Sequence, residues 1–204
     1  TAILRDAEAH AAGDAKALIR YFRRCRSSRM DELHESQRKV DCLDYLIYCL
    51  KEEGIYCYLD MITYRKFKEG DGVVDHELLL DKARPWSTTN PRLIELQKEF
   101  CTQIWTHYNP YTKLCYKDDP VFVLTEITNE NHLFMNYDGS NRFLVKSDYY
   151  EGEFRAFFRD WLAAKGLDYD WEHCDLFSPD EPMIEFKLDK MTEYYRCIYH
   201  RMDL

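Results

Sequence analysis

Two short apolar segments, each preceded by a predicted helix, constrain the fold of this chain most. Residues 55–59 read Ile-Tyr-Cys-Tyr-Leu, and residues 121–127 read Val-Phe-Val-Leu-Thr-Glu-Ile. Both segments are largely apolar on the two faces that a strand presents, which is typical of a buried strand in a parallel sheet. The sequence therefore predicts adjacent, central, parallel strands near 55–60 and 121–127.

Helical patterns surround these two segments. Leu43, Leu46, Ile47 and Leu50 follow the i, i+3, i+4, i+7 spacing of an amphipathic helix, and Gly54 comes after its last turn, where a positive φ is favoured. The predicted helices cover residues 41–53, 90–108, 147–165 and 182–202. Because strands and helices alternate, the fold class is predicted to be α/β with a parallel sheet.

Composition excludes several classes of protein. The net charge of −9 argues against a nucleic-acid partner and against a polybasic membrane-surface protein. No apolar run reaches the ~20 residues of a membrane span. No phosphate-binding glycine motif and no paired metal-ligand spacing occurs, so no cofactor and no metal is expected.

The eight cysteines form no C-x-x-C pair, which favours free thiols in a reducing compartment and leaves a disulfide framework as the alternative. This favours a cytoplasmic location slightly. Secretion is the alternative location, because the chain does not begin with Met.

The most informative polar stretch is Thr-Glu-Ile-Thr-Asn-Glu-Asn at 125–131. If the strand pleat continues, Glu126, Thr128 and Glu130 point to the same side. A carboxylate at Glu126, inside an apolar strand, must be paired or have a raised pKa. Glu130 comes just after the strand, where it can reach a substrate. The alternative for Glu130 is an ordinary solvated loop residue.

An apolar strand that runs into Glu-x-x-Asn-Glu resembles the fourth strand of clan A glycoside hydrolases, in particular cellulase-like family five and its relatives. Leu50-Lys-Glu-Glu-Gly-Ile-Tyr56 resembles the entry to the third strand of that clan. Three intervening segments resemble related bacterial glycosyl hydrolases: Leu96-Gln-Lys-Glu-Phe100, His107-Tyr-Asn-Pro-Tyr-Thr112 and Tyr116-Lys-Asp-Asp-Pro120. The resemblance covers about 41–134 well and the remainder weakly.

The resemblance implies roles for individual residues. Glu130 would be the general acid/base, and Asn129 would hydrogen-bond the 2-hydroxyl of the sugar. Aromatic faces stack on sugar rings in such enzymes, although most aromatic residues here are expected to form core. The substrate-binding candidates are Asn129, Glu126, Asn131, His132, Tyr64 and Trp86, with Tyr137 and Asp138 next.

The resemblance also implies a partial (β/α)8 barrel over residues 41–204, preceded by a charged helical segment at 1–40. A full barrel takes ~250 residues, and no strand ending in a second catalytic Glu is evident among the 74 residues after Glu130. The expected function is hydrolysis of O-glycosidic bonds by a retaining mechanism, with a carbohydrate as partner. This stretch of chain alone is expected to be inactive, because its nucleophile is not identified. Two alternatives stay open: a non-catalytic carbohydrate-binding or scaffold remnant, and an unrelated α/β interaction domain.

Overall fold

The computed structural model describes residues 15–61, 66–79, 83, 85–129, 131–134 and 146–200. These residues group into two compact units. The first unit holds residues 15–56 together with Asn109–Lys113, and the second holds most of the remaining chain. Each unit is described by itself.

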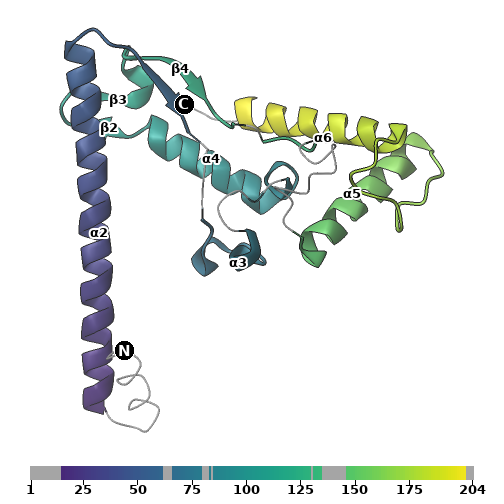
Figure 1. Ribbon diagram of the computed structural model, residues 1–204, viewed down its shortest axis with the longest axis horizontal. Coiled ribbons are helices and arrows are strands. Elements are labelled where there is room, and N and C mark those ends of the chain that lie inside the picture. Colours follow the sequence, from purple (N-terminus) through teal and green to yellow (C-terminus); the bar gives the residue numbers. More distant parts are fainter. Residues whose placement is uncertain are drawn as a thin grey trace. The chain divides into compact units, whose positions relative to one another are not determined.

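The helices longer than one turn lie at both ends of the chain and in its middle (Figure 1): α2 (Ala15–Glu52), α3 (His76–Leu79), α4 (Pro91–Trp105), α5 (Asp148–Lys165) and α6 (Glu181–His200). The strands are short: β1 (Cys57–Asp60), β2 (Tyr108–Asn109), β3 (Leu114–Cys115) and β4 (Phe122–Glu126). Single 3-10 turns cover Glu69–Asp71, Trp86–Thr88 and Tyr116–Asp118.

The first unit is dominated by α2, a single helix of 38 residues that Figure 1 shows without interruption. It continues through residues 40 and 41, between which the sequence analysis placed a domain boundary. The helix ends where the sequence predicts, because Gly54 adopts φ +70°. The amide of Gly54 donates to the carbonyl of Lys51 at 3.0 Å, and that of Ile55 donates to Leu50 at 2.8 Å.

A tight turn at Asn109–Lys113 belongs to the same unit and contacts the carboxyl-terminal half of α2. The buried Asn109 amide donates to the backbone carbonyl of Asp44 at 3.0 Å, and its Oδ1 accepts from the Tyr111 amide at 2.9 Å. The Tyr111 hydroxyl donates to Asp41 at 2.9 Å. One asparagine therefore shapes the turn and attaches it to the helix.

In the second unit, β1 and β4 pair in parallel, as the sequence predicts, with Asp60 opposite Glu126. One face of this sheet packs on the core through Leu59, Met61 and Ile127. On the other face Tyr58 is 52% exposed and Leu124 is 62% exposed. Within the second unit no described element covers that face, and the expectation that both strands are central and buried on both faces stays a prediction. A (β/α)8 barrel stays a prediction, since the described strands form only two-stranded sheets, β1–β4 and β2–β3.

The core of the second unit lies among α4, α5, α6 and the segment that precedes α4. The predicted helix starts are confirmed, since the side chain of Asn90 accepts from the Leu93 amide and that of Ser147 accepts from the Tyr150 amide. Residues 64–87 lie outside the predicted helices and strands, and they contribute buried core side chains where they are described. These include Phe67, Val73, Leu79 and Trp86.

Candidate functional site

The carboxyl ends of β1 and β4 bring two acidic residues together. Asp60 and Glu126 are register partners and the last residues of their strands. The amide of Met61 donates to the Glu126 carbonyl at 2.9 Å, so the pairing extends past the strand ends. Because Tyr58 precedes Asp60 by two residues, its side chain lies on the same face of the sheet. The carboxyl groups therefore lie on the face that carries the exposed Tyr58.

Tyr58 is the hydrogen-bond partner of Glu126. Its hydroxyl donates to Glu126 Oε2, and this bond is the main reason that the pKa of Tyr58 is raised to about 12. The phenol consequently stays protonated at neutral pH. Glu126 was expected to need a partner, and Tyr58 on the neighbouring strand is that partner. The sequence analysis had predicted no role for Tyr58 beyond its place in the strand.

Asp60 lies in a different electrostatic setting. Burial raises its pKa, and the neighbouring charge of Glu126 raises it further. Its Oδ1 is buried and has no hydrogen-bond partner among the residues that the structure describes. The site therefore offers one carboxyl group with increased proton affinity, a second that accepts a hydrogen bond from a phenol, and a tyrosine ring open to solvent. Such a set can bind hydroxyl groups and exchange protons with them.

Two of the predicted site residues, Glu130 and Tyr64, lie outside the described residues, as do Tyr137 and Asp138. Asn129, which directly precedes Glu130, is half-buried.

Asn131 is a core residue and not a free ligand-binding group. It is 7% exposed, and its Oδ1 accepts from the Ser87 hydroxyl at 3.0 Å. Its amide donates to the Tyr194 hydroxyl at 3.3 Å, and that hydroxyl donates to Gln97 at 2.7 Å. Both ends of the Asn131 side-chain amide are used within the protein, and its substrate-binding role stays a prediction. The network attaches the segment after β4 to α4 and α6.

His132 is half-buried, and its Nδ1 accepts a hydrogen bond from the Phe134 amide at 3.1 Å. A ring nitrogen that accepts carries no proton, so the neutral ring holds its proton on Nε2. His132 thus has a defined tautomer, set by the backbone two residues further on.

Trp86 is also a core residue. It is 1% exposed, stacks on Tyr150 at 6.2 Å between ring centroids, and meets the edge of Phe154 at 5.9 Å. Its ring is enclosed by protein, and its role as a sugar platform stays a prediction. The exposed ring beside the carboxyl groups belongs to Tyr58. In the sequence, the i, i+2 spacing of Tyr58 and Asp60 indicates that both side chains lie on the same face of the strand.

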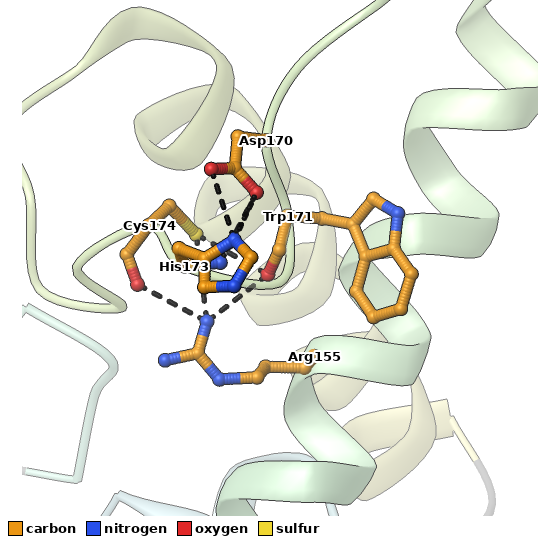
Figure 2. Close-up of polar contacts among 5 residues, drawn as sticks. All are labelled: Arg155, Asp170, Trp171, His173 and Cys174. Atoms are coloured by element: carbon orange, nitrogen blue, oxygen red, sulfur yellow. Dashed lines mark hydrogen bonds and ion pairs between the residues drawn. The ribbon is translucent and has the colours of Figure 1, made fainter.

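A second polar cluster lies between α5 and α6 (Figure 2). Arg155 from α5 points at the connecting loop and donates to the carbonyls of Trp171 at 3.0 Å and Cys174 at 3.1 Å. In the same loop Asp170 accepts from the backbone amide of His173 at 3.2 Å. Burial raises the pKa of the Cys174 thiol, which disfavours a reactive thiolate. These contacts make the cluster a support for the loop.

No group of three metal-ligating side chains occurs within the described ranges. The seven cysteines of the described part that can be assessed are free thiols, and only Cys101 among them is fully buried. Across the helices that the structure describes, none has the length and apolar character needed to cross a membrane.

Comparison with known proteins yields no match: no family model, no curated protein and no solved structure is significantly similar to this chain.

Proposed function

We propose that this chain carries the acid/base half of a glycoside hydrolase site. The observation that supports the proposal best is the pair Asp60 and Glu126, with Tyr58, at the carboxyl end of two adjacent parallel strands. In parallel α/β folds this end of the sheet is where substrate-binding groups gather. The Asn129-Glu130 pair follows Glu126 within four residues of the chain.

Each of these groups has a different role in the proposed hydrolysis of a glycosidic bond. Glu130 donates a proton to the leaving oxygen and later activates water. Glu126 and Asp60 accept hydrogen bonds from sugar hydroxyls, while the Tyr58 ring, 52% exposed, offers an apolar face. A retaining enzyme also needs a nucleophilic carboxylate about 5–5.5 Å from the acid. No residue of this chain is assigned to that role.

A second candidate function is carbohydrate binding without turnover. The exposed Tyr58 and Leu124 beside two carboxyl groups favour it, because sugar-binding surfaces combine an apolar face with hydrogen-bond acceptors. Both candidates require the same ligand class, and they differ in whether bonds are cleaved.

The test is a titration of the full chain with a panel of oligosaccharides, followed by NMR and by release of reducing ends. We expect binding that shifts the amide signals of β1 and β4. The double variant Tyr58→Phe with Asp60→Asn should abolish it, while Asp168→Asn, an exposed acidic control in the loop before α6, should leave it unchanged. A Kd above about 10 mM for every sugar would contradict both candidates.

Turnover separates the two candidates. It is measured on a longer parent protein that also supplies the nucleophile, because this stretch of chain alone is expected to be inactive. Glu130→Gln should remove activity on natural glycosides, whose leaving group needs a proton, and spare activated aryl glycosides more. Binding without any cleavage would select the second candidate. Equal losses on both substrate types would argue against Glu130 as the acid.

A further inference from the structure

The helix α2 exposes an apolar stripe along most of its length. Ile19 is 51% exposed, Leu33 58%, Val40 38% and Leu43 46%. Soluble monomers rarely leave large apolar side chains in a continuous row open to water. An apolar row of this kind on a helix of 38 residues, about 57 Å long, is a surface that another element is expected to cover.

The spacing of the stripe identifies the kind of element that fits. Ile19, Leu33 and Val40 are separated by multiples of seven residues, and Leu43 follows Val40 by three. A seven-residue repeat with a three-four alternation keeps one seam facing a partner helix in a coiled coil. Arg26 and Arg29 occupy the same two repeat positions in the second heptad. The stripe is therefore suited to a second α-helix.

Within the first unit, the described residues leave this stripe open. The turn at Asn109–Lys113 contacts α2 at Asp41, Asp44 and Tyr45. Asp44 and Ile47 are buried, but Leu43 and Leu46 beside them remain about half exposed. The open part of the seam thus runs from Ile19 to Leu43, and the next position of the repeat, Ile47, is buried.

The charges of α2 are divided between its two halves. Residues 15–29 contain six basic and no acidic residues, whereas residues 31–53 contain seven acidic and three basic ones. A second copy lying parallel would set the basic halves side by side and Arg26 and Arg29 against their own counterparts. A copy lying antiparallel sets each basic half against an acidic half. Like charges in contact destabilise and opposite charges stabilise such pairs.

We propose that α2 pairs in antiparallel fashion with α2 of a second copy of this chain. Of the registers that the repeat allows, the one with the fullest overlap sets Leu33 opposite Ser36, Arg26 opposite Leu43 and Arg29 opposite Val40 of the other copy. The arginine stems then cover apolar side chains. In this register Glu32 lies beside Lys39 of the other copy, and this pair occurs twice by symmetry.

Sedimentation of the full chain tests the pairing. We expect a reversible dimer, and the variant Leu33→Asp with Leu43→Asp should be monomeric at the same concentration. The control variant Ser27→Asp with His34→Asp adds two charges at exposed positions outside the seam and should remain dimeric. Circular dichroism verifies that each variant keeps its helix. A wild-type monomer with a fully formed helix, or a dimer that survives the seam variant, would overturn the proposal.

Charge reversal tests the orientation. Glu32→Lys and Lys39→Glu alone should each raise the dimer Kd about tenfold, because two attractive pairs become repulsive. Combining them should return the Kd close to that of the wild type, since the pair is restored with its signs exchanged. Salt should weaken the wild-type dimer. A double variant no better than the single ones, or a dimer that tightens with salt, would contradict the antiparallel arrangement.

Discussion

The helices α2 and α5 show opposite ways of using an apolar stripe. In α5 the buried residues Tyr150, Phe154, Phe158 and Leu162 recur every four residues, and other parts of the core cover them. In α2 the stripe residues Ile19, Leu33 and Val40 are separated by multiples of seven, with Arg26 at the repeat position between the first two. The stripe residues from Ile19 to Leu43 are open to water. The spacing of the apolar residues thus distinguishes a helix that packs on the core of its own unit from one that is suited to pairing with a second helix.

The largest expected effect is a contrast in unfolding free energy between these helices. Phe158 is fully buried and contacts the rings of Trp161, Tyr169 and Phe186. Phe158→Ala should cost about 3–5 kcal/mol, because it removes a ring and leaves a cavity. Leu33→Ala should cost less than about 0.5 kcal/mol at concentrations where the chain is monomeric. Urea denaturation of both variants measures the contrast, and similar losses would contradict it.

The next effect concerns the polar network that holds the segment after β4. Asn131→Ala should lower the free energy of unfolding by about 1–3 kcal/mol, because Ser87 loses its buried partner. Ser87→Ala is the matched variant, and the double variant should cost less than the two single losses together. Additive losses in urea denaturation would show that the two side chains act independently.

A pH-dependent effect is expected from Lys187, which is 2% exposed in the packed unit. Burial lowers its pKa to about 8, so between about pH 8 and 10 the unfolded chain binds the extra proton. The stability of the wild type relative to Lys187→Met should therefore rise with pH across this window, by roughly 1–3 kcal/mol. Thermal unfolding at several pH values measures the difference. A constant difference, or one that falls as pH rises, would disagree with a buried ammonium group.

The smallest effect is expected at the candidate site. The pKa of Asp60 is raised by burial, so ionisation of this carboxyl group opposes folding above its pKa. Asp60→Asn should increase stability at neutral pH by less than about 0.5 kcal/mol, and the gain should vanish as the pH falls toward about 4. A clear loss of stability at pH 7 would mean that the charged form is favoured in the folded state.

Sequence reasoning predicted what depends on local patterns. The parallel pairing of 57–60 with 122–126, the helix starts near 90 and 147, and the helix end at Gly54 all follow from short-range signals. It did not predict that one sheet face is open, because apolar residues on both faces do not reveal whether a cover exists.

At the candidate site, sequence reasoning identified Glu126 but not its partner Tyr58 on the neighbouring strand. The burial of Trp86 and Asn131 depends on residues such as Phe154 and Tyr194, which lie 68 and 63 positions away (154 − 86 and 194 − 131) and which no local pattern encodes. The continuity of α2 through residue 40 was missed because its seven-residue repeat was divided between two predicted segments.

Hydrogen exchange of the wild-type chain at two concentrations tests the contrast between the helices most directly. We expect amides of residues 19–43 to gain protection as concentration rises, because pairing with a second copy suppresses local opening of α2. Amides of α4 and α5 should keep the same protection at both concentrations, since their partners lie in the same chain. Protection of residues 19–43 that is independent of concentration would contradict the inference that α2 depends on a second copy.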